Sequence, residues 1–167
     1  MAAAIRPLGP SDREAAVAVI DAAARWYREF LPAEEVHDPE MTPEQWDAEA
    51  RTVRWYGAFD GKALVGVMGL ERRGPAALLR HAYVLPAYQR RGIGARLREH
   101  LEAAAAGAER IIVGTYAANY KARRALEQGG YTLSPDPVAV LRAYYRIPED
   151  RLRASVTYEK PLPPVPT

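Results

Sequence analysis

Hydrophobic residues near the start of the chain recur every three or four positions, which predicts a helix with one apolar face from about residue 11 to residue 30. The positions on that face are Ala15, Val19, Ala22, Trp26 and Phe30. Ser11 and Glu14 have the spacing of a capping box, and Pro32 is expected to end the helix. A short strand over residues 3–8 is expected before it.

The next stretch changes from a helical to a strand-like pattern. Residues 42–45 (Thr-Pro-Glu-Gln) combine an N-cap, a proline in the first turn and a capping partner, which predicts a short helix to about residue 52. Strand-like segments then follow at residues 53–59, 62–71 and 76–84. Asp60-Gly61 favours a tight hairpin between the first two, and Gly74-Pro75 favours a second turn. An antiparallel meander is therefore expected.

The second half of the chain alternates helices with strands. Helices are expected at residues 92–106, 119–128 and 138–146, the first two closed by glycines and the third capped by Asp136. Strands are expected at residues 110–115, from 131 to 133 and at 153–160, before a proline-rich tail over 161–167. This order predicts a mixed α/β fold in which a meander leads into two crossover units.

Composition limits the number of domains and the available chemistry. A chain of 167 residues with 49% hydrophobic and 26% charged residues is typical of one folded domain, expected to span residues 1–167. There is no cysteine, so disulfides, thiolate metal sites and an acyl-cysteine intermediate are excluded. His37, His81 and His100 lack the spacing of metal ligands, and no metal is expected.

Charge and hydropathy also bear on location and partners. The first residues lack the apolar core of a signal peptide, and no apolar run approaches the roughly 20 residues needed to cross a bilayer. We expect a cytoplasmic protein, a monomer or a homodimer, without a membrane partner. The formal net charge of +2 gives no global attraction to nucleic acid, and no aromatic residues interleave the arginines at 90–98. Nucleic-acid binding is not expected.

A glycine-containing loop between a predicted strand and a predicted helix carries the main functional signal. Gly92 and Gly94 allow the backbone to approach an anion, and the first amides of the following helix are unpaired at the positive end of its dipole. Arg90, Arg91, Arg96 and Arg98 add positive charge to the same region. The loop therefore predicts a site for phosphate groups.

Two other phosphate-binding loops are disfavoured by the residues that follow. The dinucleotide fingerprint requires a third glycine, but that position is Leu97. A P-loop requires Gly-Lys-Ser/Thr, whereas Ala95 and Arg96 stand here. Neither a Rossmann-type site nor a P-loop site for ATP is expected.

Two segments of the chain resemble the signature motifs of the GNAT acetyltransferase family. The first has the spacing of motif A at Val84, Pro86, Gln89, Gly92 and Gly94, and the second resembles motif B, with Asn119 opening a helix that ends in Gly130-Tyr131. The resemblance implies acetyl-CoA as cosubstrate. It implies cofactor contacts at Val84, Gln89, Arg90, Arg91, Gly92, Ile93, Gly94, Ala95, Arg96 and Asn119.

The resemblance further implies direct transfer of the acetyl group to an amine, within a cleft between the third meander strand and the strand at 110–115. The family often supplies a general acid from a tyrosine in motif B, but the matching position is Leu126. Tyr116 and Tyr120 are candidate substitutes. His81 is the candidate general base, because imidazole titrates near neutral pH; Glu71 is the alternative. Strand alternation would place His81 and Tyr83 on one face.

An acidic segment points to the acceptor. Residues 29–49 contain eight acidic residues and no lysine or arginine, so an acidic lining is expected to attract a cationic amine. The predicted function is N-acetylation of a primary amine of a small molecule or peptide. The alternative is a non-catalytic module that senses acetyl-CoA through the same loop.

Overall fold

The computed structural model describes residues 3–26, 28, 33, 37–145, 147 and 149–164. Its strands form a sheet in the order β1-β2-β3-β4-β5-β7-β6 within this part of the chain. The strands are β1 (Ala4–Pro7), β2 (Val53–Asp60), β3 (Ala63–Arg73), β4 (Ala76–Val84), β5 (Arg110–Tyr116), β6 (Thr132–Leu133) and β7 (Ser155–Pro161). The longer helices are α1 (Arg13–Trp26), α2 (Pro43–Glu49), α3 (Ile93–Ala104), α4 (Tyr120–Gln128), α5 (Pro137–Tyr144) and α6 (Glu149–Ala154).

The predicted meander is confirmed. β2 pairs with β3, and β3 with β4, in antiparallel register. Gly61 and Gly74 have φ values of +60° and +57°, the left-handed conformation that the two connecting turns require. The helix predicted from residues 42–45 is also confirmed, since the Thr42 side chain accepts a hydrogen bond from the amide of Gln45 at 3.1 Å.

The crossover region differs from the expectation in one respect. β4 and β5 are parallel and connected through α3, as predicted, but β7 lies between β5 and β6 and is antiparallel to both. The second crossover, through α4, therefore passes over one strand position. The short helix α6, which the sequence pattern did not predict, leads the chain into β7.

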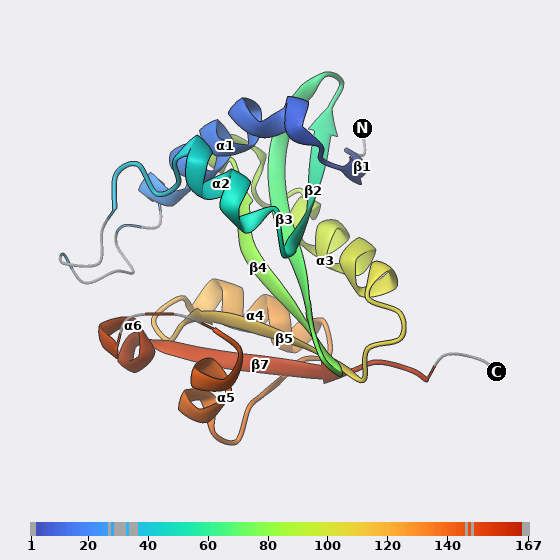
Figure 1. Cartoon of the computed structure of the whole chain (residues 1–167), viewed down its shortest axis with the longest axis vertical. Coiled ribbons are helices and arrows are strands. Elements are labelled where there is room, and N and C mark those ends of the chain that lie inside the picture. Colours follow the sequence, from blue (N-terminus) through green and yellow to red (C-terminus); the bar gives the residue numbers. More distant parts are fainter. Residues whose placement is uncertain are drawn as a thin grey trace.

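β4 and β5 separate along their length. Their parallel pairing covers Ala76–Leu79 against Arg110–Val113, although β4 continues to Val84 and β5 to Tyr116. In Figure 1 the meander strands rise away from β5 and β7 at this point. The predicted separation of these two strands is confirmed, and among the described residues it leaves the end of β4 without a paired strand on that edge.

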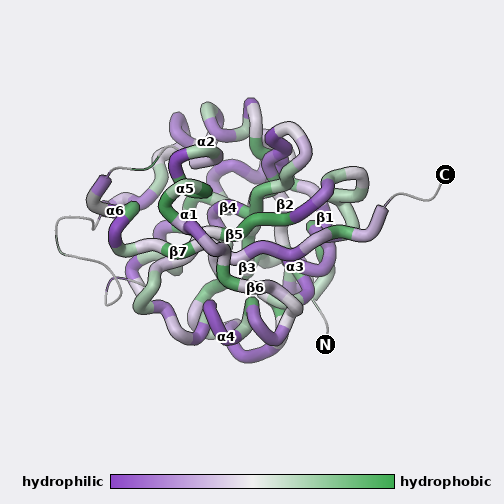
Figure 2. Tube along the Cα trace, turned by 90° about the horizontal axis from the view of Figure 1, so that it is seen from below, coloured by the Kyte–Doolittle hydropathy of each residue, from purple (hydrophilic) through white to green (hydrophobic). Residues whose placement is uncertain are grey.

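Helices cover both faces of the sheet. On one face, α3 and α4 pack Leu97 and Leu126 into the main core, together with Leu79. On the other face, α1 and α2 bury Ile20 and Trp46 against β2 and β3, and α5 covers the β4–β5 end. Figure 2 shows α4 as a mostly hydrophilic segment at the periphery of the molecule, consistent with one buried side chain, Leu126, in that helix.

The structure corrects the predicted start of α1 and its predicted buried face. Residues 10–12 form a 3-10 turn in which the carboxylate of Asp12, not Glu14, accepts a hydrogen bond from the Gly9 amide at 2.8 Å. The buried residues of α1 are Ala16, Val17, Val19, Ile20 and Ala23. Of the predicted apolar face, Val19 is buried as expected and Ala22 is half-buried, but Ala15 and Trp26 are exposed. Packing instead buries the bulky Val17 and Ile20 beside Val19. Phe30 and Pro32 lie outside the described residues.

Candidate functional site

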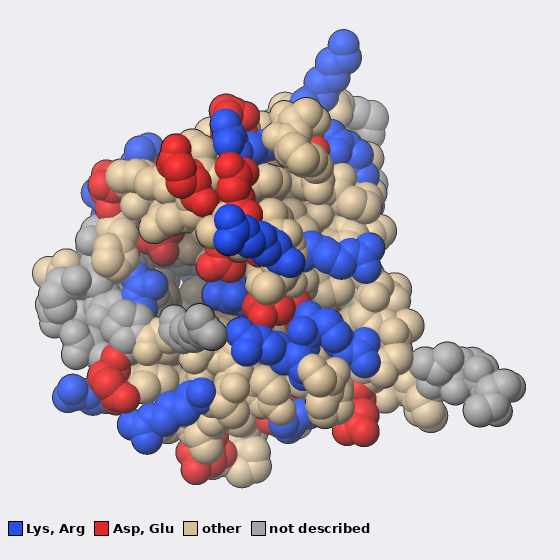
Figure 3. Space-filling view, in the orientation of Figure 1, with Lys and Arg blue, Asp and Glu red and all other residues tan. Residues whose placement is uncertain are grey.

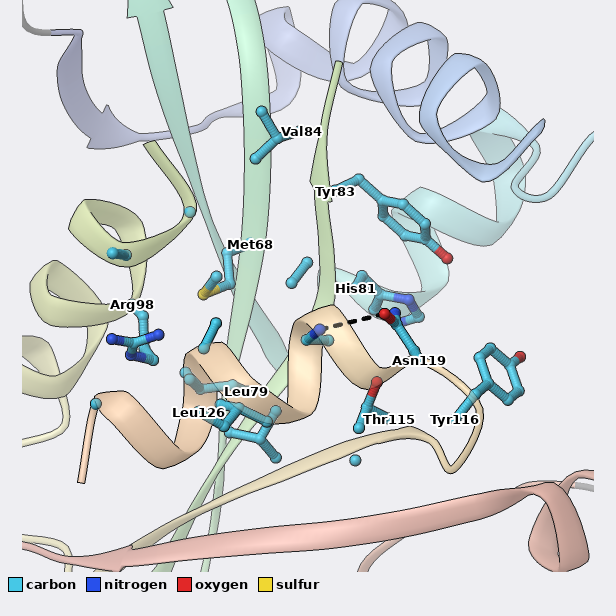
Figure 4. A pocket seen from close by; sticks show the side chains of 18 of the residues that line it. Met68, Leu79, His81, Tyr83, Val84, Arg98, Thr115, Tyr116, Asn119 and Leu126 are labelled. Atoms are coloured by element: carbon cyan, nitrogen blue, oxygen red, sulfur yellow. Dashed lines mark hydrogen bonds between the residues drawn. The ribbon is translucent and has the colours of Figure 1, made fainter. Parts of the chain in front are cut away.

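A cavity of about 670 Å³ opens where β4 and β5 separate. β4 contributes His81 to Val84, β5 contributes Val113 to Tyr116, and α3 and α4 close the sides. Figure 4 shows Arg98 on the α3 side of this cavity and His81, Tyr83 and Tyr116 on the opposite side. The cavity thus connects the start of α3 with the ends of α1 and α6, which contribute Ala24 and Arg151.

The loop before α3 has the conformation that the two glycines predicted. Arg90 and Gly92 have φ values of +63° and +75°. Gly92 is the N-cap without a side-chain hydrogen bond, and the amide of Arg96 makes the first helical bond, to the Gly92 carbonyl at 3.0 Å. The amides of residues 93–95 come before that bond, in the first turn, where a helix provides no carbonyl partner for them. Gly94 and Ala95 line the cavity, whereas the side chain of Ile93 is buried in the core.

Side chains around the loop brace it and add charge. Gln89 donates from Nε2 to the Val84 carbonyl at 3.2 Å, which ties the loop to the end of β4. The guanidinium of Arg91 lies 5.0 Å from the ring centre of Tyr88. Arg90 and Arg91 are exposed and Arg96 is half-buried. None of these three arginines lines the cavity, so their positive charge lies outside its entrance.

Arg98 is the arginine of this group that reaches the cavity. Its side chain is 12% exposed and lies 3.6 Å from Glu102. A β-carbon at Gly129 would come within 2.5 Å of an Arg98 nitrogen, so the glycine at the end of α4 makes room for the guanidinium. The glycine that sequence analysis assigned to helix termination therefore also allows α3 and α4 to approach.

Asn119 begins α4 as predicted. Its Oδ1 accepts a hydrogen bond from the amide of Ala122 at 3.2 Å, and the residue is 7% exposed. Figure 4 draws this bond, with Asn119 beside the cavity. Since the oxygen caps the helix, the amide NH2 is the group of Asn119 that remains to donate toward the cavity, which this residue lines.

The edge of β4 offers backbone donors to the cavity. The amide of Leu85 donates to Val65 of β3 at 2.9 Å. Because successive amides of a strand point to opposite edges, the amide of Val84 points away from β3, toward the edge that β5 leaves open. Val84, one of the cofactor contacts that the resemblance implies, therefore directs its amide toward the cavity that it lines.

A β-bulge in β4 changes the direction of its side chains. Val67 pairs with Tyr83 and Gly69 with Arg80, so β4 has one extra residue opposite Met68. His81 has φ of +54° there. Strict alternation, which the sequence analysis assumed, is therefore wrong: the neighbours Arg80 and His81 both reach the same carboxylate, as described next.

His81 is held between an aromatic ring and a carboxylate. Its ring stacks on Trp55 at 5.3 Å between centroids, and Trp55 stacks on Trp46. Its Nε2 lies 3.5 Å from Oε2 of Glu49, which is also 3.2 Å from Arg80. The polar contact with His81 holds the pKa of Glu49 below its ordinary value, against the opposing effect of burial. Sequence spacing gave no signal for Glu49.

Glu71 is buried and paired with arginine side chains. It is 2% exposed and its carboxylate contacts Arg73 at 2.6 Å and Arg80 at 2.8 Å. It does not line the cavity. Two arginines hold Glu71 inside the fold and outside the cavity lining, so its position does not support a role as the alternative base.

The two candidate acids lie in different places. Tyr116 lines the cavity, while Tyr120 is 73% exposed, does not line it, and stacks against Arg123 at 5.9 Å. Leu126, at the position where the family often has tyrosine, is 6% exposed and forms part of the cavity wall. Tyr83 also lines the cavity, and sequence analysis assigned it no role.

The acidic segment contributes one described carboxylate to the cavity, Glu40. Burial raises the pKa of Glu40, and the charge of Arg151 opposes the increase. Asp38 pairs with Arg28 at 2.6 Å, and Asp47 with Arg13 at 2.8 Å. Glu29, Glu34 and Glu35 lie outside the described residues. For the described part of the segment, the expected acidic lining is thus reduced to Glu40.

The outer surface carries charges of both signs. Figure 3 shows lysine and arginine side chains interspersed with acidic ones, and a hollow between the half with α1 and α2 and the half with α5 and α6. Within the described residues, no cluster of three or more histidine, aspartate or glutamate side chains is arranged to hold a metal ion. None of the described helices has the length and apolar content needed to cross a membrane.

Comparison with known proteins gives a consistent family assignment. The model of the acetyltransferase (GNAT) family matches residues 20–131. The PaiA N-acetyltransferase of Thermoplasma acidophilum, crystallised with coenzyme A, has a TM-score of 0.76, 18% identity, and coverage of 96% of this chain and 99% of that chain. A search of curated protein sequences finds no significant match.

Two further solved structures share the fold. The GNAT-family acetyltransferase of Staphylococcus aureus Mu50 has a TM-score of 0.75 and 17% identity, covering 97% of this chain and 100% of that chain. The ribosomal-protein-S18-alanine N-acetyltransferase of Escherichia coli has a TM-score of 0.69 and 18% identity, covering 96% and 94%. At these identities the likeness concerns the fold.

Proposed function

The chain belongs to the GNAT acetyltransferase family, and on that premise we propose that it transfers the acetyl group of acetyl-CoA directly to a primary amine of a small molecule or peptide. The proposal rests on one observation: the uncapped amides that begin α3 lie beside a cavity that also contains His81. An anion-binding turn and a titratable base at one cavity are the two parts that such a reaction needs.

In the proposed complex the amides of residues 93–95 bind the pyrophosphate of the cofactor. The positive end of the α3 dipole and the charges of Arg90, Arg91 and Arg96 favour the phosphates there. The pantetheine arm then extends along the open edge of β4, beside Asn119, as an additional strand would. Its thioester is directed toward the end of the cavity that contains His81 and Tyr116.

The transfer itself is one substitution at the thioester carbonyl. The neutral amine attacks the carbonyl carbon, a C–N bond forms and the C–S bond breaks. His81 accepts the proton that the amine loses, and Tyr116 donates a proton to the departing thiolate. The amide of Val84 stabilises the oxyanion, and holding both reactants in one cavity removes much of the entropic barrier.

We predict that the purified protein releases free thiol from acetyl-CoA when a suitable primary amine is present. A panel of mono-, di- and peptide amines, followed with a thiol-reactive dye, tests this. Release accelerated by an amine supports the transferase. Saturable coenzyme A binding in calorimetry without acceleration by any amine supports the sensor module instead, because the cofactor site would then work without chemistry.

Glu40 supports a cationic acceptor, because it is the carboxylate that the described part of the acidic segment contributes to the cavity lining. We predict that Glu40→Gln raises KM about 10-fold for a diamine whose second ammonium group reaches this carboxylate, equivalent to about 1.4 kcal/mol. For a monoamine of similar length, KM is expected to change less than about twofold, because a rim charge contributes little without a partner. Steady-state kinetics with both amines measure the difference.

The matched control for this prediction is Glu44→Gln. Glu44 is exposed in the first turn of α2 and does not line the cavity, so its substitution makes the same change in net charge away from the acceptor. An equal rise in KM for the monoamine and the diamine, or an equal effect of both variants, would contradict a role for Glu40 in binding a second charge.

A further inference from the structure

The carboxylate of Glu49 lies beside His81 in the folded chain, although the two residues are far apart in the sequence. Glu49 is the last residue of α2, whereas His81 lies in the bulge of β4. Oε2 of Glu49 lies 3.5 Å from Nε2 of His81. The helix end and the bulge together therefore place an anion beside the imidazole that the proposed function uses as the base.

The same carboxylate is fixed on its other side by a chain of ion pairs that includes the buried Glu71. Arg80 lies 3.2 Å from Glu49 Oε2 and 2.8 Å from Glu71 Oε1. Glu71 is 2% exposed and also contacts Arg73 at 2.6 Å. A carboxylate held by a half-buried, paired arginine loses much of its rotational freedom, so Glu49 presents its oxygen to His81 from a defined direction.

The imidazole is restrained to one orientation. Its ring stacks on Trp55 with an interplanar angle of 29°. Nε2 of His81 is buried and makes no hydrogen bond among the described residues. A buried ring nitrogen needs a partner, and Glu49 is the anion beside it. With the proton on Nε2 facing Glu49, the lone pair of Nδ1 becomes the one available to accept a proton.

We propose that Glu49 is a positioning residue for His81: it fixes the tautomer with the proton on Nε2 and stabilises the imidazolium that forms when Nδ1 takes a proton from the acceptor amine. The two atoms lie 3.5 Å apart, so a small adjustment of either side chain brings them within hydrogen-bond distance. The inference rests on the proposed function, since it takes His81 to be the base.

The charges around His81 decide the expected pH effect. Glu49 from α2 contacts His81, and Arg80 from β4 contacts Glu49. Glu40 and Arg151 line the same cavity. An anion in contact with an imidazolium stabilises it relative to the neutral ring. The loss of the Glu49 charge is therefore expected to move the acid limb of the rate profile to lower pH.

The test compares Glu49→Gln, Glu49→Asp and Glu44→Gln in the full-length protein. For Glu49→Gln we expect the acid limb of the pH profile of kcat/KM to move to lower pH, because an opposite charge at contact distance is lost. The plateau rate is expected to fall about 10- to 100-fold, because the imidazolium loses its partner. Glu49→Asp is expected to retain most of the profile. Glu44→Gln makes the same change in net charge in the exposed first turn of α2, outside the cavity lining, and its acid limb is expected to stay in place.

A second readout does not depend on activity. Long-range ¹H–¹⁵N spectra of histidine-labelled protein report the tautomer of each imidazole, with His81 assigned by its absence in His81→Asn. The wild type is expected to show the Nε2–H tautomer, and Glu49→Gln a mixture of both. Thermal unfolding of each variant identifies loss of structure.

The outcomes separate this inference from the proposed function. An active wild type whose Glu49→Gln variant keeps the same acid limb and the same tautomer overturns the role of Glu49. A wild type that releases no thiol with any amine overturns the proposed function, while the tautomer measurement still decides whether Glu49 positions His81.

Discussion

Replacing Gly92 with valine is expected to weaken the binding of coenzyme A about 100-fold, which corresponds to losing roughly two charge-assisted hydrogen bonds. Gly92 has φ of +75°, a conformation that costs an L residue about 1–2 kcal/mol and a β-branched residue more. The turn is then expected to relax toward negative φ and turn the amides of residues 93–95 away from the phosphates. Calorimetric titration with coenzyme A measures the loss.

Gly74 provides a matched control for this substitution. It has φ of +57° in the β3–β4 turn, and neither glycine has a neighbouring atom within 4 Å of an added β-carbon. Gly74→Val therefore introduces the same backbone strain at a site outside the cavity lining. It is expected to lower thermal stability but to leave coenzyme A affinity within about twofold. Equal affinities of the two variants would refute the anion-binding role of the loop.

Replacing His81 with asparagine is expected to lower kcat by about 10²- to 10⁴-fold, the usual contribution of a positioned general base. Asparagine tolerates the φ of +54° at this position, so the variant tests the imidazole and not the bulge. Without the base, solvent must deprotonate the amine, and the remaining rate is expected to rise steadily with pH. Steady-state kinetics across pH 6–9.5 with saturating acetyl-CoA test this expectation.

Cofactor binding and a distant tyrosine serve as controls for His81→Asn. Coenzyme A affinity is expected to stay within about twofold, because the imidazole faces the acceptor side of the cavity and not the phosphates. Tyr120→Phe is expected to retain full activity, since Tyr120 is 73% exposed and does not line the cavity. Full activity of His81→Asn with an unchanged pH profile would show that His81 does not act as the base.

Short-range sequence patterns were sufficient to predict the elements that depend on residues close together in the chain. The N-cap at Thr42, the hairpin at Asp60-Gly61 and the turn at Gly92 depend on residues within four positions of one another, and each has the predicted form. The position of Asn119 at the start of α4 follows the same logic. For this reason the glycine turn at Gly92 and its place between β4 and α3 could be predicted before any tertiary contact was known.

Alternation along a strand and periodicity along a helix were less reliable guides where packing chooses between similar faces. The apolar side of α1 was misassigned, because its many alanines give several faces with almost equal hydrophobicity. The place of β7 between β5 and β6 depends on pairing between residues 25 to 51 positions apart, from Leu133 and Tyr158 to Arg110 and Pro161. Such pairing leaves no local signal in the sequence.

The sequence by itself determined the meander, the crossover through α3 and the conformation of the glycine turn before α3, because each is encoded by short-range turn, capping and hydrophobic patterns. Only the tertiary structure decided which side chains meet around His81. The bulge opposite Met68 turns His81 toward Glu49, and the end of α2 supplies a carboxylate 32 positions earlier in the chain. Contacts of this kind arise from the packing of helices on the sheet, whose energies depend on all the neighbouring side chains at once.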